Sequence, residues 1–397
     1  MPPSSLPTRP DETARTPAAA GANRPGQASG PSGPGQASGP ARTVRAPAAR
    51  MSRRADLVTV ALSAWLIGGL FVDGWAHNTR PQLETFFTPW HAMFYSGFAA
   101  SALWIGWSVW SRHRAGAAWR DSVPAGYGPA VAGLALFAAS GLGDMAWHLA
   151  FGIEQDVAAL LSPSHLGLFT GGFLVVTAPL RSAWADPSLG RRAGLGALLP
   201  ALFSAAIAGS GTGFFFMYLH PAFDNEASIG HARFLGQFFT QAQRGYVQDQ
   251  DIALGVAGFV LATAFLLEPV LYLLRRWDLP AGSVLLVVGP QFVLIQALTG
   301  FVDPGLVVLG LTGALAVELL LGLLHPAPAA PGRLRVFCAT APVALWGVWF
   351  AGIALNDGGL GWEPEVWGGV LTWSGLSLLA LSLFMVPPPV PVAAEPR

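Results

Sequence analysis

The chain has 397 residues, of which 52% are hydrophobic and only 11% charged, and its formal net charge is zero. A soluble domain carries about 25% charged residues, so this composition excludes an ordinary soluble protein. We also expect no nucleic-acid partner, because nucleic-acid binding requires a basic patch. Apolar runs of about 20 residues recur and are too long for barrel strands, so we predict an all-α, polytopic transmembrane helical bundle in a lipid bilayer.

The N-terminal 50 residues differ in composition from the rest of the chain. Residues 1–50 are rich in Pro, Gly, Ala and Ser, and one heptapeptide occurs at both 25–31 and 34–40. Such a segment cannot bury a core, so we predict a disordered tail. Met51 directly precedes the first apolar run, and either Met1 or Met51 is the expected start. The transmembrane domain then covers 51–386, and a Pro-rich tail, 387–397, follows it.

The apolar runs predict about ten spans, separated by short polar connections and by one longer polar loop, 220–250. The predicted spans are 57–76, 88–110, 128–151, 162–182, 195–219, 251–273, 280–302, 304–324, 334–355 and 364–386.

Arginine placement predicts how the spans are oriented. Arginines gather before the first span and after each even-numbered span up to the eighth, whereas the alternate loops hold few. Cytoplasmic loops carry the excess of basic residues, so both termini are expected in the cytoplasm of a multi-pass cell-membrane protein. The loops after the odd-numbered spans then face outward. The arginines in question are Arg53, Arg54, Arg112, Arg114, Arg120, Arg181, Arg191, Arg192, Arg275, Arg276, Arg333 and Arg335.

A polar motif occurs twice at the predicted outer face. Asp73 and His77 end the first span, and Asp144 and His148 end the third in the same Asp-x-x-x-His frame, 71 residues later. Residues four apart share one face of a helix, so each pair is expected to point the same way. The hairpins 57–110 and 128–182 therefore form a predicted internal repeat, parallel because both begin on the inner side.

A second histidine follows each pair at a predicted helix start. His91 and His165 lie in the first turn of the second and fourth spans, where helix-end potential favours the neutral imidazole that binds metals. Each is followed six residues later by a glycine, Gly97 or Gly171, which permits close helix approach. The helix starts themselves are Thr88 with Pro89 and Ser162 with Pro163, each an N-cap residue followed by proline at the first helical position.

Each hairpin thus offers one carboxylate and two imidazoles at one depth. Two histidines with one carboxylate suit zinc, copper or non-haem iron, so all six side chains are predicted metal ligands. Glu84 and Glu154 lie in the connectors and are candidates for a catalytic proton-transfer group, a further ligand or a partner of a ligand. The structural alternative is that each Asp–His pair is a polar clamp that pins two helices without metal.

Other polar residues leave two alternatives each. His220, and Asp224, Glu226 and His231 in the loop after it, would complete or cover a site, or are solvated loop residues.

Two carboxylates are predicted deeper in the bundle. Glu268 and Glu318 lie in spans six and eight, where they would form a proton path or hydrogen-bond across helices.

The paired frame resembles the integral membrane C subunit of the copper-dependent membrane monooxygenases, the methane and ammonia monooxygenase group. The resemblance covers about residues 70–170. Asp73, His77 and His91 match that family's first frame, and His148 and His165 match its second. Asp144 stands where the family has Asn, and the spacings to His91 and His165 are somewhat long. The chain also has more predicted spans, and it lacks the cupredoxin-like domain that a partner supplies there.

The resemblance implies copper as the cofactor, dioxygen activation on a small apolar substrate arriving through the bilayer, and additional membrane subunits. It makes a membrane metalloprotein of the copper-oxygenase type our first hypothesis, with zinc or iron as alternative metals. The second is a transporter of metal or small solutes, because internal repeats are common in transporters. The third is a membrane scaffold that uses the Asp–His pairs only for packing.

Overall fold

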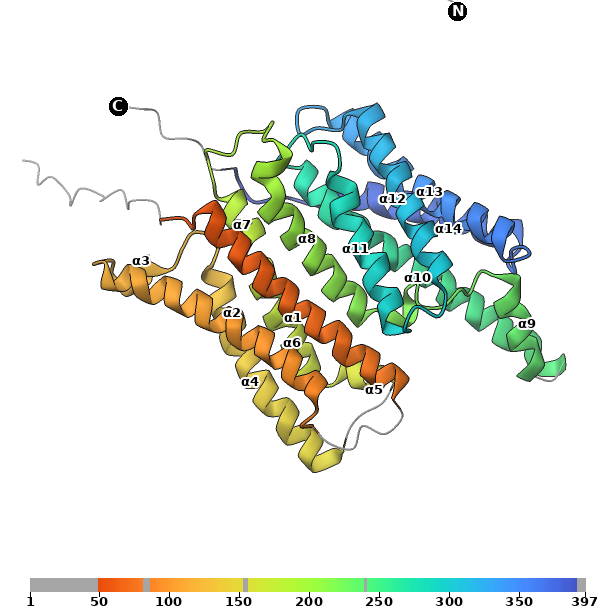
Figure 1. Ribbon diagram of the computed structural model, residues 1–397. Coiled ribbons are helices and arrows are strands. Elements are labelled where there is room, and N and C mark those ends of the chain that lie inside the picture. The colour runs from red at the N-terminus through yellow and green to blue at the C-terminus, as the bar shows by residue number, and fades with distance from the viewer. Residues whose placement is uncertain (1–48, 81–85, 153–155, 239–240, 391–397) are drawn as a thin grey trace, which may run out of the picture. The chain divides into compact units, whose positions relative to one another are not determined.

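The computed structural model describes residues 49–80, 86–152, 156–238 and 241–390. All described helices belong to the unit Pro47–Arg397. The predicted disordered tail, 1–50, lies outside the described residues except for its last two positions. Within the described residues the fold is all-α, as predicted (Figure 1). The helices are α1 (Arg53–Thr79), α2 (Pro89–Arg114), α3 (Trp119–Ser122), α4 (Gly128–Phe151), α5 (Asp156–Leu161), α6 (Pro163–Val176), α7 (Ala178–Trp184), α8 (Leu195–Phe215), the 3₁₀ helix η1 (Met217–Leu219), α9 (Ile229–Phe238), α10 (Gln241–Leu274), α11 (Ser283–Leu298), α12 (Pro304–Leu324), α13 (Pro331–Asn356) and α14 (Pro364–Phe384).

Each of the ten predicted spans coincides with helix. Eight helical segments in the described residues are long and apolar enough to cross a membrane, which makes the chain a multi-pass membrane protein. The second and seventh predicted spans fall outside that set: α2 is 26 residues long and not among those candidates, and α11 has only 16 residues. The candidate spans are Arg53–Thr79, Gly128–Phe151, Pro163–Trp184, Leu195–Phe215, Gly245–Leu274, Pro304–Leu324, Pro331–Asn356 and Pro364–Phe384.

Two boundaries differ from the sequence prediction. The fourth span, Pro163–Trp184, contains two helices, because Thr177 ends α6 and begins α7 just before Pro179. The predicted polar loop 220–250 is partly helical: α9 lies within it, and α10 begins at Gln241 rather than near 251. The hydroxyl of Ser228 accepts a hydrogen bond from the backbone N–H of His231, so a serine N-cap starts α9 where the polar composition indicated a loop.

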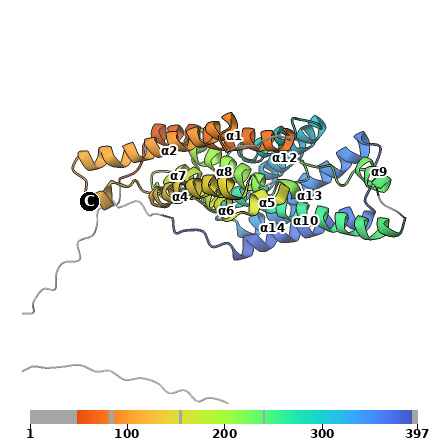
Figure 2. The same ribbon diagram turned by 90° about the horizontal axis from the view of Figure 1, so that it is seen from below.

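The hairpins α1–α2 and α4–α6 are closely packed pairs, and α1 also contacts α8 and α11 (Figures 1 and 2). Glycine permits both hairpins to close, as predicted. A Cβ atom at Gly97 would lie 2.7 Å from backbone atoms of Leu66, and one at Gly171 would lie 2.7 Å from the backbone nitrogen of Phe137. No larger residue fits such spacings, so these two glycines bring the helices of each hairpin into backbone contact.

Polar contacts between distant segments identify one end of the bundle. Arg50 pairs with Asp186, Arg53 donates to the carbonyl of Gly196, and Arg191 lies 3.1 Å from Asp278. Arg53 is the first residue of α1, and Asp73 lies 20 residues further along that helix, a rise of about 30 Å. The arginine-rich end and the end that carries the Asp–His frames are therefore opposite ends.

The two deeper carboxylates have different surroundings. Glu318 caps α11: one of its carboxylate oxygens accepts from the backbone N–H of Gly282 at 2.8 Å, and the other accepts from Val284 at 2.8 Å and Leu285 at 3.2 Å. These bonds satisfy N–H groups that a helix start leaves without partners. Glu318 thus forms the cross-helix hydrogen bonds that were one of its two predicted roles, whereas Glu268 is exposed on α10.

Candidate metal centre

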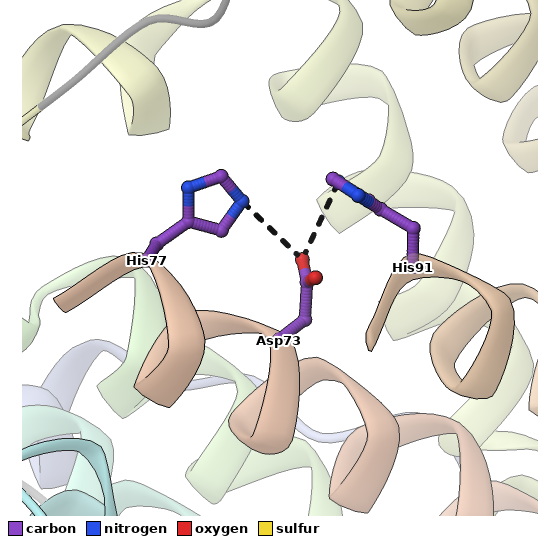
Figure 3. A group of neighbouring side chains, drawn as sticks. All are labelled: Asp73, His77 and His91. Carbon is purple, nitrogen blue, oxygen red and sulfur yellow. Dashed lines mark ion pairs between the residues drawn. The ribbon is translucent and has the colours of Figure 1, made fainter. Parts of the chain in front are cut away.

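The first triad consists of Asp73 and His77 from the last two turns of α1 and His91 from the first turn of α2. Figure 3 shows both imidazoles turned toward the carboxylate of Asp73. Asp73 Oδ2 lies 3.9 Å from His77 Nε2 and 3.6 Å from His91 Nε2. Asp73 is only 8% exposed, so the carboxylate is buried between the two rings.

The second triad repeats this arrangement with Asp144 and His148 from α4 and His165 from α6. Asp144 Oδ1 lies 3.5 Å from His148 Nε2 and 3.2 Å from His165 Nε2. Asp144 is 1% exposed, so this carboxylate is buried more deeply than that of the first triad. The sequence repeat is therefore also a repeat in space.

Each triad has the geometry of a site for one metal ion. One ligand atom from each member can be chosen so that all three lie within 4.8 Å of one another. Two ligands of a tetrahedral ion, each bonded at about 2.0–2.1 Å, are about 3.3 Å apart. The Nε2–Oδ separations of 3.2–3.9 Å are close to that value, so small side-chain movements suffice to place three ligands around one ion.

Hydrogen bonds to the far side of three rings hold Nε2 toward the carboxylates. The Nδ1 atom of His91 lies 2.9 Å from the N-cap hydroxyl of Thr88, and that of His165 lies 2.7 Å from the hydroxyl of Ser162. The Nδ1 atom of His148 lies 3.1 Å from the carbonyl of Gly152. Contacts of this kind fix ring orientation in metal sites. Thr88 and Ser162, the N-cap residues of α2 and α6, therefore also orient the rings of His91 and His165.

The two carboxylates differ in their hydrogen bonds. The hydroxyl of Tyr95 donates to Asp144 Oδ2 at 3.2 Å, and the hydroxyl of Ser164 donates to Asp144 Oδ1 at 3.1 Å. Asp73 Oδ1 is buried and has no hydrogen-bond partner among the described residues. A buried, unsatisfied carboxylate oxygen is costly, and a cation bound by Asp73 would remove that cost. The first triad therefore fits a metal ion through the chemistry of its donors and through this unpaired oxygen.

The two triads are neighbours. The ring centroids of His91 and His148, one from each triad, are 6.5 Å apart. Phe86 packs on both, at 5.1 Å from the ring of His91 and 6.0 Å from that of His148. Two ions bound here would occupy neighbouring sites, with the ring of Phe86 against one histidine of each.

One cavity of about 660 Å³ is lined by all six triad residues. The rest of its wall is mostly apolar and comes from α1, α6 and α8, with contributions from α2 and α4. Ligand sites are commonly concave, largely apolar and equipped with a few convergent polar groups. The cavity therefore gives a bound molecule access to both triads.

The structure brings together all six predicted metal ligands. The two predicted proton-transfer residues, Glu84 and Glu154, lie outside the described residues. Tyr95, Ser164 and Phe86 also belong to the site, although no motif in the sequence predicted them. Tyr95 follows His91 by four residues and so shares its face, and Ser164 directly precedes His165, but neither spacing alone indicates a contact with Asp144.

The other histidines near this end lie away from the triads. His220 is buried against Phe265 and Phe292, and its Nδ1 accepts from the backbone N–H of Ala222 at 3.0 Å. His231 on α9 lies 3.5 Å from Asp224 and 3.1 Å from Asp251. None of these residues lines the cavity.

The His231 cluster is an ion-pair network between the segment that precedes α10 and Asp251 of that helix. Hydrogen bonding to Asp224, with a further bond to Asp251, raises the pKa of His231 to about 9. The bond to His231 correspondingly lowers the pKa of Asp224. Burial, helped by the neighbouring Asp251 and Asp224, raises the pKa of Glu226 to about 7. A charged imidazolium is a poor metal ligand, so this cluster differs in chemistry from the two triads.

No family model, curated protein or solved structure matches the chain significantly. The fold and the site together establish a membrane-spanning helical protein whose two Asp–His–His groups can hold metal ions.

Proposed function

We propose that this chain is the metal-binding membrane component of an oxygenase, with one copper ion in each triad. The observation that carries the proposal is the convergence of two Asp–His–His triads on one cavity. A packing clamp needs no cavity, and it would pair both oxygens of each carboxylate. The unpaired, buried Asp73 Oδ1 thus favours metal binding over the clamp.

Copper is proposed for two reasons. Imidazole nitrogen with a single carboxylate and no thiolate is a donor set suited to copper, zinc or iron. Among these, the resemblance of the paired frame to the copper-dependent membrane monooxygenases favours copper. Zinc or iron in the triads would keep the metal site and change the chemistry proposed for it.

Bound copper would supply the one-electron redox chemistry through which dioxygen is activated. The chain's own residues would bind the metal and orient its ligands. The six triad side chains would be the ligands, Thr88 and Ser162 hold two of the imidazole rings in place, and the apolar wall of the cavity would exclude water. Oxygen insertion into a C–H bond, with reduction of the second oxygen atom to water, consumes two electrons and two protons. An external reductant is therefore part of the proposal, and Glu84 and Glu154 are the proposed proton carriers.

The orientation proposed from the sequence puts this centre at the outer face. The arginine-rich end lies opposite the triads, and cytoplasmic ends carry the excess of basic residues. Substrate would then arrive through the bilayer, and additional membrane subunits would supply electrons.

Metal analysis of the purified full chain tests the proposal. We expect two copper ions per chain, one fewer after His91→Ala, one fewer after His165→Ala, and none after both. His113→Ala is the matched control, because His113 lies at the opposite end of α2 and packs on Trp119. Absence of copper, zinc and iron from the wild-type protein, with lowered thermal stability in the variants, would establish the packing clamp instead.

Reconstituted vesicles separate an oxygenase from a transporter. Oxygen consumption that depends on reductant and disappears with His91→Ala and His165→Ala supports the oxygenase. Net solute flux without oxygen consumption would refute it in favour of transport. Glu318→Gln is a useful second variant. Because Glu318 caps α11, the substitution should lower the stability of the protein without a specific defect in transport.

A further inference from the structure

The cavity is long as well as large. The cavity-lining residues of α1 run from Leu66 to Thr79, and the 13 helical steps between these two correspond to about 20 Å. On α6 they run from His165 to Val176 along one face, at spacings of three or four residues. The cavity therefore extends from the end that carries the triads toward the middle of the bundle.

The cavity is polar at one end only. Asp73 lies seven residues, or about 10 Å, nearer to the mouth than Leu66. Inward of Asp73 and Tyr95 the wall consists of apolar side chains and glycine, including Leu66, Val176 and Ala208. The volume of 660 Å³ would hold about 20 water molecules, but waters in the inner half would find few polar partners.

The dimensions favour an elongated occupant. The cavity follows α1 for about 20 Å, and its volume of about 660 Å³ is far more space than a gas-sized molecule fills. An extended alkyl chain matches both this length and the apolar inner wall.

We propose that the cavity binds a linear hydrocarbon chain, with its tail directed inward and its outer part beside the two triads. The proposal assigns a substrate class to the proposed oxygenase and rests on that function only for what happens to the chain after binding. Binding itself depends on the apolar inner half. Free alkyl compounds and the acyl chains of membrane lipids share this chemistry and are the two possible sources.

Two glycines in the wall offer a direct test. A Cβ atom at Gly172 would lie 3.7 Å from the ring of Phe137, and one at Gly211 would lie 3.4 Å from Ile67 Cδ1. These are tolerable contacts, so a larger side chain can start at either position and extend into the cavity. Gly68 on α1 is the matched control, because a Cβ there meets nothing within 4 Å and Gly68 does not line the cavity.

The test uses the full chain in lipid nanodiscs with dodecan-1-ol that carries a photoreactive diazirine at its methyl end. After irradiation, mass spectrometry should locate cross-links on peptides containing Leu66, Val176 or Ala208. Gly172→Leu and Gly211→Leu should each reduce these cross-links at least tenfold, with a smaller loss for Gly211→Ala, whereas Gly68→Leu should leave them unchanged. Cross-links confined to outward-facing residues such as Leu103, or equal in all variants, would overturn the proposal.

A second arm identifies the source, using phosphatidylcholine with the same diazirine at the end of one acyl chain. Inner cross-links from this lipid would assign the cavity to membrane lipid, and cross-links from the alcohol alone would assign it to free alkyl compounds.

Metal content, measured on the same samples, keeps the two proposals separate. The glycine variants should retain their metal, and the protein with His91→Ala and His165→Ala should retain the inner cross-links without metal. Inner cross-links in a wild-type protein that lacks metal would uphold chain binding and refute the oxygenase. Bound metal without inner cross-links would refute chain binding and leave the oxygenase proposal standing.

Discussion

The two triads share one sequence frame and differ in how their carboxylates are held. Asp144 receives hydrogen bonds from Tyr95 and Ser164, and its distances to the imidazoles are 3.2 and 3.5 Å. Asp73 has an unpaired buried oxygen, and its corresponding distances are 3.6 and 3.9 Å. The second triad is thus positioned before any metal binds, whereas the carboxylate of the first is held by fewer contacts.

This difference shows that a repeated motif need not yield equivalent sites. The frame places three ligands in each hairpin, but the donors to Asp144 come from outside the frame, and one of them comes from the other hairpin. Positioned ligands lose less conformational freedom on binding, so we expect the second triad to bind metal more tightly. The predictions below test this inequality.

The largest effect should follow Asp144→Ala. The substitution removes a metal ligand and leaves the hydroxyls of Tyr95 and Ser164 without their acceptor. We expect the second ion to be lost and the metal-free protein to be destabilised by about 2 kcal/mol, since buried donors without partners cost about 1–3 kcal/mol each. Titration with copper and the unfolding of metal-free protein measure the two effects. A metal-free stability equal to wild type would contradict the asymmetry.

Asp73→Ala should abolish metal binding at the first triad without lowering the unfolding free energy of the metal-free protein. Asp73 Oδ1 has no hydrogen-bond partner among the described residues, so its removal breaks no hydrogen bond there and relieves a buried charged group. We expect metal-free Asp73→Ala to match the wild-type unfolding free energy within about 0.5 kcal/mol, or to exceed it. Measured beside Asp144→Ala, a loss as large as in that variant would show that the two carboxylates are held alike.

A smaller effect is expected from Tyr95→Phe, which removes one donor to Asp144 and keeps the ring. Loss of a hydrogen bond to a metal ligand typically weakens binding by about 10–100-fold. Because Ser164 still holds the carboxylate, we expect about tenfold at the second triad and no change at the first. Ser164→Ala should act similarly. Equal weakening at both triads would show that Tyr95 serves the cavity as a whole.

The smallest effect concerns the His231 cluster, which provides a contrast without metal. Hydrogen bonding to Asp224 raises the pKa of His231 from 6.5 to about 9. The resulting stabilisation is complete below about pH 6.5 and is lost as the pH rises through about 9. The protection factor of α9 against hydrogen exchange, in which the intrinsic pH dependence of exchange is divided out, should fall across this range, and His231→Gln should remove that fall. Glu226, whose pKa is raised to about 7, acts in the same direction in a lower window.

An unchanged protection factor of α9 between pH 6.5 and 9 in the wild-type protein would contradict this ion pairing. Copper should not alter the protection factor, because the cluster lies apart from the triads.

Features of the site that depend on local sequence patterns could be predicted from the sequence. The Asp-x-x-x-His spacing predicted shared helix faces, the Thr88 and Ser162 caps predicted where His91 and His165 lie, and the two glycines predicted close packing. These predictions succeeded because each depends on residues within one hairpin. The contact of Tyr95 with Asp144 depends on how one hairpin docks on the other, which no spacing encodes. The cavity likewise requires the placement of α8 against α1 and α6.

The average composition of a segment did not predict where helices begin and end inside it. The 220–250 region is polar, yet Ser228 provides the cap for a helix inside it. The 162–182 run is one candidate span, as predicted, but its helix is interrupted at Thr177. The sequence could not decide whether Glu318 belongs to a proton path or hydrogen-bonds across helices, because its three backbone partners lie more than 30 residues earlier in the chain.

Each triad is closed within a single hairpin, over residues 73–91 and 144–165, and this bears on the order of assembly during synthesis. Contacts between residues close in sequence form early, and the N-terminal parts of a chain are made first. We therefore expect both triads to be complete before α8 to α14 have been synthesised. The bond from Tyr95 to Asp144 and the packing of Phe86 on His148 must wait for the two hairpins to meet, but the ligands of each triad need not. Metal could therefore be acquired by a nascent chain whose remaining helices are still to be added.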